Sequence, residues 1–251
     1  VGKALLILQN VSLMARQSAE GQATELEWCK QGNFHVTDGD YLRMVHQKTT
    51  YYSFIAPVNI GAMVAGASAQ QALALRLFAT ALGTAFQIQD DILNLAADES
   101  HYGKDLECDL WEGKHTLILL HALRSCTESE RTQALRALSK PRPQSPSQTG
   151  PDLQGLLSAL ASEPNLTSST RLLIRSALDA LEAREGKSLD DVQFLRSLIE
   201  RYRSVDYARG RAMQRARRAE RGLTRMDTWL SPGVHRDFLH ELTRFVVDRD
   251  H

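Results

Sequence analysis

Cysteine, proline and aromatic residues are all scarce in this chain of 251 residues. The three cysteines are an odd number and include no C-x-x-C pair, which excludes a disulfide framework and a cysteine zinc site. We therefore expect a reducing, cytoplasmic environment. Long apolar runs are also missing, because stretches such as Ala4–Leu8 fall far short of the roughly 18 to 20 residues that span a membrane. We therefore expect no transmembrane segment.

An excess of charge of one sign is absent as well. The chain carries 30 Lys and Arg against 30 Asp and Glu, which argues against a dedicated nucleic-acid binder. Hydrophobic residues make up 43% and charged residues 24%, a composition typical of a globular protein with a sizeable core. Because the chain opens on Val1 and shows no targeting signal, we expect further residues upstream.

Proline is concentrated in one place. Four of the seven prolines lie in the serine- and glutamine-rich stretch 140–155, which predicts a flexible insertion. On both sides of it apolar residues recur three and four positions apart, as in amphipathic helices. The sequence therefore predicts an all-α fold, a single-domain helical bundle over residues 1–251. Capping residues predict helix starts near Asp38 or Asp40, Ser68, Asp152 and Ser188.

Charge is unevenly distributed along this neutral chain. Between Asp90 and Glu112 eight acids accompany one lysine, a net charge of −7 that favours a metal site. Between Arg201 and Arg225 nine arginines accompany two acids, a net charge of +7. The basic run is typical of a solvated helix face. Attraction to anionic lipid headgroups is the second interpretation, and nucleic acid is the third because few aromatics interleave with the arginines.

The most informative run is FQIQDDILNL, residues 86–95. On a helix, Gln87, Asp90, Asp91 and Asn94 follow the i, i+3, i+4, i+7 spacing and form one polar stripe. Buried carboxylates are costly unless a cation neutralises them. Mg²⁺ prefers oxygen ligands and is commonly shared with substrate phosphates. The stripe is therefore either a magnesium site or an ordinary solvent-facing helix side.

Three lysines accompany these carboxylates. Lys104 follows in Gly-Lys-Asp, Lys114 follows in the segment DLWEGKHT, and Lys48 precedes Thr49 in an earlier helical stretch. Lysine is a point charge suited to phosphate oxygens. Taken singly, each lysine is as readily a surface residue, but lysines that hold phosphate and carboxylates that hold Mg²⁺ belong together chemically.

In order and spacing, these motifs resemble those of the trans-type isoprenyl diphosphate synthases, especially the geranylgeranyl type. Two further segments carry the resemblance, Gly21-Gln22-x-x-Glu25 and Val205-Asp206-Tyr207-Ala208. The resemblance implies an all-helical, usually homodimeric enzyme with a deep central cavity. It also implies a magnesium-dependent condensation of isopentenyl diphosphate with an allylic diphosphate.

The same resemblance implies ligands for Mg²⁺. Asp90 would bind the metal directly, and Asp91 would act through water or a lysine. Asn94 stands where many members of the family have a third aspartate, and its amide keeps an oxygen ligand while lowering the charge of the site.

Roles in substrate binding follow from the resemblance too. Lys48 and Lys104 would bind the departing diphosphate, with Lys114 nearby. Thr49 and Gln87 would line the cavity, where hydroxyl and amide dipoles stabilise an allylic cation.

One part of the family pattern is absent from the sequence. The first aspartate-rich motif, D-D-x-x-D, does not occur before Asp90. Three interpretations remain open: a synthase whose upstream residues are missing from this sequence, a non-catalytic partner subunit of a heteromeric synthase, or a class I terpene cyclase. The cyclase would ionise the same kind of substrate without chain extension.

Overall fold

The computed structural model describes residues 2–96, 108–142, 160, 167–182 and 186–248. This part of the chain contains helices and connecting turns and no strand, so the predicted all-α fold is confirmed. Lys104 lies outside the described residues. The helices are α1 (Gly2–Gln31), α2 (Asp38–Val45), the π-helix η1 (His46–Ile55), α3 (Ala56–Ala65), α4 (Ala69–Ala96), α6 (Cys108–Glu112), α7 (Leu117–Ser125), α8 (Glu128–Ser139), α10 (Ser168–Glu182), α11 (Leu189–Arg201), α12 (Ser204–Met226) and α13 (Val234–Asp248).

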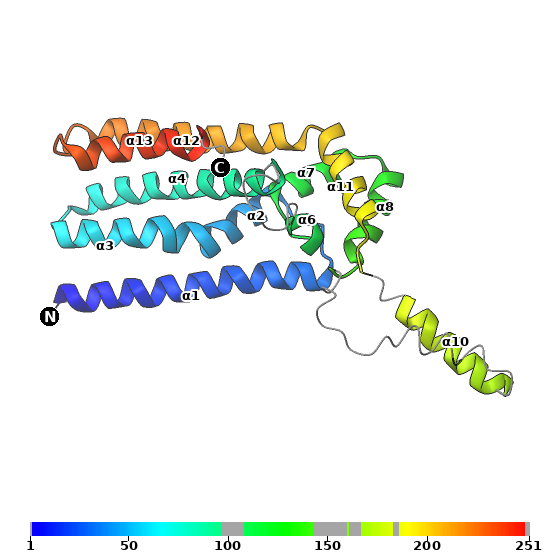
Figure 1. The fold of residues 1–251 in the computed structure, drawn as a ribbon. Coiled ribbons are helices and arrows are strands. Elements are labelled where there is room, and N and C mark those ends of the chain that lie inside the picture. The colour runs from blue at the N-terminus through cyan, green and yellow to red at the C-terminus, as the bar shows by residue number, and fades with distance from the viewer. Residues whose placement is uncertain (1, 97–107, 143–159, 161–166, 183–185, 249–251) are drawn as a thin grey trace.

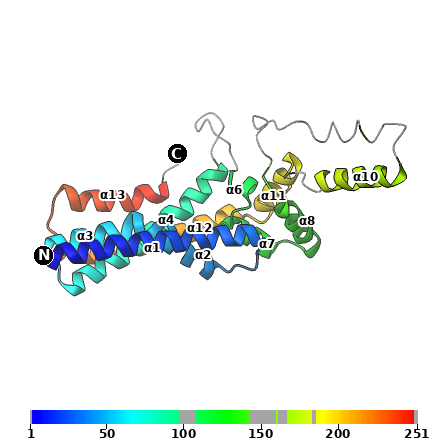
Figure 2. The ribbon, with the colours of Figure 1, turned by 90° about the horizontal axis from the view of Figure 1, so that it is seen from below.

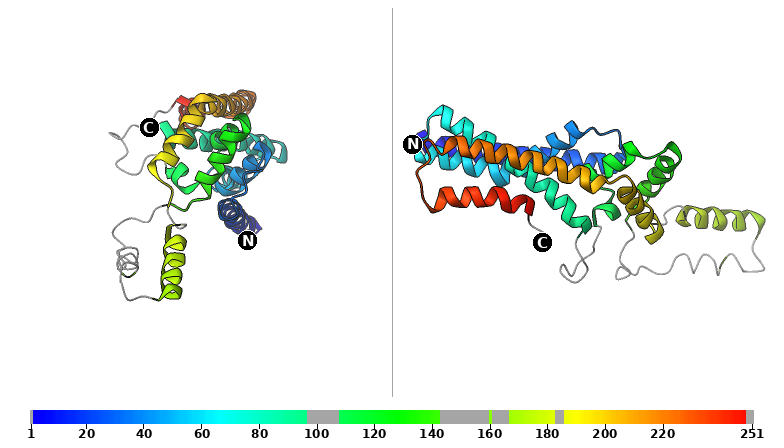
Figure 3. Two further views of the ribbon diagram at one scale, coloured as in Figure 1. Left: turned by 90° about the vertical axis from the view of Figure 1, so that its right-hand side faces the viewer. Right: turned by 90° about the horizontal axis from the view of Figure 1, so that it is seen from above.

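The long helices form an elongated bundle (Figures 1 and 2). α1 packs against η1 and α3, these pack against α4, and α4 packs along α12. α13 turns back over α12 and α4. The short helices α2, α6, α7, α8 and α11 gather at one end of the bundle, whereas α10 lies away from it (Figure 3). None of the helices in the described residues is both long enough and apolar enough to cross a membrane.

The predicted helix starts near Asp38, Ser68 and Ser188 are confirmed, although the cap of α2 is Thr37 and not Asp38 or Asp40. Thr37 caps α2 in a capping box in which Asp40 is the N3 residue, and Ser188 caps α11 in the same way with Asp191. The hydroxyl of Ser68 accepts the backbone N–H of Gln71 at the start of α4 (3.3 Å). The predicted start near Asp152 lies outside the described residues, as does most of the predicted insertion 140–155.

α4 and α12 pack closely because small side chains line their contact. The buried face of α12 is mainly alanine, at positions 208, 212, 216 and 219, and it meets Ala81, Leu82 and Ala85 of α4. The arginines of α12 lie elsewhere on the helix, and Arg217, Arg218, Arg221 and Arg225 are all exposed. Arg211 and Arg215 are half-buried, so the basic run is solvated in part and its role stays a prediction.

The first turn of α7 is buried almost completely. Residues 117–120 of α7 are each at most 1% exposed, and Thr116 caps the helix by accepting the N–H of Leu119. A helix surrounded by apolar neighbours contributes roughly 1.5–3 kcal/mol for each buried leucine or isoleucine. α7 therefore anchors the end of the bundle to which α6 belongs.

Candidate functional site

The polar stripe of α4 forms as predicted. The side-chain amide of Gln87 donates to Asp91 Oδ1 at 2.9 Å and to Asp90 Oδ2 at 3.4 Å, so the three side chains share one face. Asp90 is exposed, whereas Asp91 is only 8% exposed. The stripe therefore offers one carboxylate to solvent and holds the other inside the bundle.

Asp91 is held by a residue that the motifs do not indicate. The hydroxyl of Tyr41, on α2, donates to Asp91 Oδ2 at 2.6 Å, and the tyrosine is 1% exposed. Burial raises the pKa of Asp91 to about 7, the bond from Tyr41 opposes this shift, and the charge of nearby Asp109 adds to it. Burial and the same carboxylates raise the pKa of Tyr41 well above its usual value. Tyr41 therefore remains a hydrogen-bond donor to Asp91.

Asn94 connects the stripe to α6. Its amide oxygen accepts the backbone N–H of Asp109 at 3.2 Å, which fixes the start of α6 against the end of α4. A carbonyl oxygen has a second lone pair, so this bond leaves one acceptor position on the amide. The metal-ligand role of Asn94 stays a prediction.

A left-handed glycine directs Lys114 back toward α6. Gly113 has φ +68°, its N–H bonds to Leu110 O at 3.2 Å, and the N–H of Lys114 bonds to Asp109 O at 2.8 Å, which together form a Schellman motif. The reversal brings Lys114 Nζ to 2.7 Å from Asp109 Oδ1 and 3.3 Å from Glu112 Oε2. These bonds raise the pKa of Lys114 although burial opposes them, and burial raises that of Asp109. Asp109 is therefore a further candidate site residue, which no sequence motif predicted, and it pairs with the predicted Lys114.

The Gly-Gln-x-x-Glu motif positions Lys48. A Cβ on Gly21 would lie 2.4 Å from Lys48 N, so only glycine allows α1 to contact η1 here. One turn further along α1, Glu25 Oε2 lies 2.5 Å from Lys48 Nζ. Glu25 is 9% exposed, and Thr49 is half-buried beside Lys48. The motif therefore provides both the close approach and the acidic partner.

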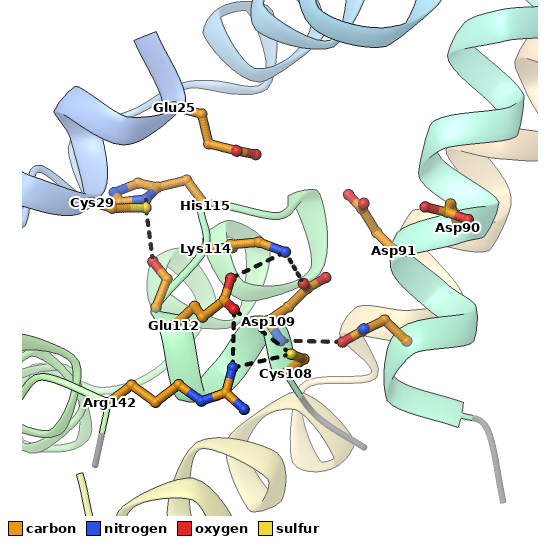
Figure 4. A network of polar contacts seen from close by, with 12 residues as sticks. Glu25, Cys29, Asp90, Asp91, Cys108, Asp109, Glu112, Lys114, His115 and Arg142 are labelled. Atoms are coloured by element: carbon orange, nitrogen blue, oxygen red, sulfur yellow. Dashed lines mark hydrogen bonds and ion pairs between the residues drawn. The ribbon is translucent and has the colours of Figure 1, made fainter. Parts of the chain in front are cut away.

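Charged side chains from α1, α4 and the α6 segment converge (Figure 4). Glu25, Asp91, Asp109 and Lys114 point toward one region between these helices. Their proximity also appears in the electrostatics, because Glu25 contributes to the raised pKa of Asp109 and Asp109 contributes to that of Asp91. Tertiary structure thus unites motifs that lie far apart in the sequence.

The donor set fits a magnesium ion that is shared with a substrate. Within the described residues, no group of three or more His, Cys, Asp or Glu side chains has the arrangement of a metal site. Asp90 and Asp91 nevertheless place two carboxylates on one helix face. Mg²⁺ usually keeps several waters and is bound by one or two carboxylates together with substrate phosphates. An all-protein metal cage is therefore not required.

Comparison with known proteins identifies the family. Residues 2–149 match the family model described as polyprenyl synthetase. The chain belongs to the polyprenyl synthetase family. It is 40% identical over 120 residues to geranylgeranyl diphosphate synthase of Sulfolobus acidocaldarius, which covers 48% of this chain and 36% of the relative. It is 34% identical over 132 residues to octaprenyl diphosphate synthase of Escherichia coli, which covers 53% of this chain and 40% of the relative.

Solved structures show the same architecture. The crystal structure of geranylgeranyl pyrophosphate synthetase from Pyrococcus horikoshii matches with a TM-score of 0.69 and 25% identity, covering 99% of this chain and 60% of that chain. A decaprenyl diphosphate synthase from Rhodobacter capsulatus shares the fold with a TM-score of 0.71 at 22% identity, covering 98% of this chain and 60% of that chain. The chain therefore spans less than two thirds of the length of these proteins.

Proposed function

We propose that the protein is a magnesium-dependent trans-prenyltransferase that condenses isopentenyl diphosphate with an allylic diphosphate. The observation that carries this proposal is the convergence of α4 carboxylates with the Lys114 segment and Glu25, the acidic partner of Lys48. Membership of the polyprenyl synthetase family supports the same reaction class. A geranylgeranyl product is our preferred assignment, although relatives include an octaprenyl synthase.

The proposed chemistry is ionisation of an allylic diphosphate, which creates a carbocation and a highly charged leaving group. Bound Mg²⁺ would neutralise oxygens of that leaving group. Lys48 and Lys114 would exchange their present partners, Glu25 and Asp109, in part for diphosphate oxygens, and Lys104 would join them. Ammonium groups held in place before the reaction stabilise developing negative charge without reorganisation. Thr49 and Gln87 would face the cation.

A homodimer is part of the proposal. The first turns of α1 expose several large apolar side chains, which is unfavourable for a helix fully surrounded by water. These side chains are Leu5, Leu6, Leu8, Val11 and Leu13. A second copy of the chain, packed along α1, would remove this apolar surface from water.

The test is an assay of the full-length protein with Mg²⁺, labelled isopentenyl diphosphate and allylic primers of increasing size. We expect a chain-elongated prenyl diphosphate, and its length identifies the product. No product from the protein alone, but product after mixing with a second synthase subunit, would indicate the partner-subunit interpretation. Hydrocarbon or alcohol released from geranylgeranyl diphosphate without isopentenyl diphosphate would indicate a cyclase.

The role of Asp90 is tested by Asp90→Ala. We expect turnover to fall at least about 100-fold, because a charge that stabilises the transition state is removed. Circular dichroism should show an unchanged helix content, since Asp90 is exposed. Asp190→Ala, which removes an exposed carboxylate from α11, is the matched control and should leave turnover unchanged. Full activity of Asp90→Ala would contradict the metal role.

A further inference from the structure

Lys187 is a buried lysine outside the motifs described so far. Lys187 is 2% exposed, and its Nζ donates to Leu110 O at 2.7 Å and to Trp111 O at 2.8 Å. Lysine is almost never buried to this extent unless its charge is paired or hydrogen-bonded. Both acceptors belong to the last turn of α6, whose carbonyls lack complete partners within the helix. Lys187 therefore caps the C-terminus of α6 from a distant part of the chain.

The backbone around Lys187 is itself firmly held. The N–H of Lys187 donates to Pro141 O at 2.7 Å, and Lys140 Nζ lies 2.7 Å from Asp191 Oδ2. These contacts join the end of α8 to the start of α11. The backbone that carries the ammonium group of Lys187 is therefore held in place by these contacts. Burial lowers the pKa of Lys187 to about 8, which leaves the group largely protonated at neutral pH.

The capped turn leads directly to Lys114. Leu110 O accepts both Lys187 Nζ and the N–H of Gly113, and the next residue is Lys114, whose ammonium pairs with Asp109. A shift of this turn would therefore move Lys114 and Asp109 together. A Cβ on Gly113 would lie 3.6 Å from Lys187 Nζ, which shows how closely the lysine approaches the reversal.

We propose that Lys187 is a positioning residue of the diphosphate site: its ammonium holds the C-terminal carbonyls of α6 and thereby sets the place of Asp109 and Lys114. The identity of the ligand as an allylic diphosphate rests on the proposed function. Both hydrogen bonds of its ammonium go to backbone carbonyls of α6, so Lys187 acts through the α6 turn. Partners in an outer shell of this kind commonly change affinity or activity by about 10- to 100-fold when removed.

The experiment compares Lys187→Met with Lys3→Met in the full-length protein. The methionine at position 187 keeps the unbranched shape and removes the donor, whereas the control removes an exposed lysine near the start of α1, away from α6. We expect Lys187→Met to raise KM for the allylic diphosphate about tenfold or more with a smaller change in kcat. The control should leave KM unchanged. A merely structural role would lower the active fraction, and hence kcat, without raising KM, and that result would overturn the proposal.

Amide hydrogen exchange provides a readout that does not depend on activity. Lys187→Met should speed exchange at the amides of Gly113 and Lys114 and leave those of α12 unchanged. If the wild-type protein transfers no prenyl group, the proposed function fails, and exchange still decides whether Lys187 holds the α6 turn. If Lys187→Met does not fold, Lys187→Ala, which also removes the donor, is measured in the same way. Wild-type KM and wild-type exchange in a folded variant would contradict the positioning role.

Discussion

Asp91 combines a negative charge with almost complete burial. Its two oxygens accept hydrogen bonds from Tyr41 and Gln87, yet the pKa is raised to about 7 because desolvation outweighs these bonds. A shift of this size means that the ionised side chain costs on the order of 4 kcal/mol in the metal-free fold. Such costs are typical of residues retained for function, because a cation can lower them when it binds.

Asp91→Asn tests this cost through the pH dependence of stability. The unfolded pKa is near 3.8 and the folded pKa about 7, so between these values the native state holds a proton that the unfolded state releases. The stability of the wild-type protein relative to the variant therefore falls as pH rises from about 4 to 7 and is constant above. In metal-free buffer at pH 8 we expect the variant to be about 2–4 kcal/mol more stable, measured by urea unfolding.

The matched control is Asp190→Asn on the exposed surface of α11, for which the difference from wild type should stay within about 1 kcal/mol, the contribution of an acid in the first turn of a helix. Two results would contradict the predicted cost of the buried charge. One is that Asp91→Asn is less stable than the wild type at pH 8. The other is that the difference in stability between the two proteins is the same at pH 4 and pH 8.

At the scale of elements, η1 is the unusual part of the fold. π-helices are rare and often mark functional positions, and η1 carries both Lys48 and Thr49. Two glycines, one on each neighbouring helix, allow it to pack closely. A Cβ on Gly21 would lie 2.4 Å from Lys48 N, and a Cβ on Gly83 of α4 would lie 2.7 Å from the ring of Phe54. The absence of two methyl groups therefore lets η1 pack closely against both α1 and α4.

Gly21→Ala should separate α1 from η1. The added methyl group would overlap backbone atoms of Lys48, which cannot rotate away, so we expect a loss of about 1–3 kcal/mol in unfolding free energy. Gly61→Ala on α3 is the control, because a Cβ there meets no atom within 4 Å. Helix propensity should make that variant about 1 kcal/mol more stable. Urea unfolding checks both, and equal effects in the two variants would contradict the close-packing account.

At the scale of the whole molecule, the segment between α8 and α11, here called the excursion, is described only in part and includes α10. The two ends of this excursion lie together, since Lys187 N donates to Pro141 O at 2.7 Å and Arg142 pairs with Glu112 at 3.1 Å. α10, which belongs to the excursion, lies away from the other helices (Figure 3). The contacts between the two ends of the excursion therefore join α8 to α11 directly.

Replacing residues 143–185 with a six-residue Gly-Ser linker should leave the bundle intact. A shorter loop loses less entropy on closure, so we expect the unfolding free energy to rise by about 1–2 kcal/mol. Thermal unfolding followed by circular dichroism measures the change. A fall of several degrees in Tm would show that the excursion packs on the bundle and stabilises it.

Local features could be predicted from the sequence because they depend on neighbouring residues. The cap at Ser188 and the stripe from Gln87 to Asp91 each lie within one or two helical turns. The long-range contacts that build the candidate site could not be predicted in this way. Tyr41 is 50 positions from Asp91, and Lys187 is 77 positions from Leu110. No pattern of spacing indicates such pairs.

The amino-acid sequence by itself determined the helices, the polar face of α4 and the likeness of its motifs to one family, since periodicity, capping chemistry and residue order are all local properties. Only the tertiary structure decided which carboxylate is buried, which acids pair with Lys48 and Lys114, and which distant side chain bonds to the α6 turn. The reason is physical: burial and Coulomb interactions depend on distance in space, and packing of α1, α4 and α6 sets those distances.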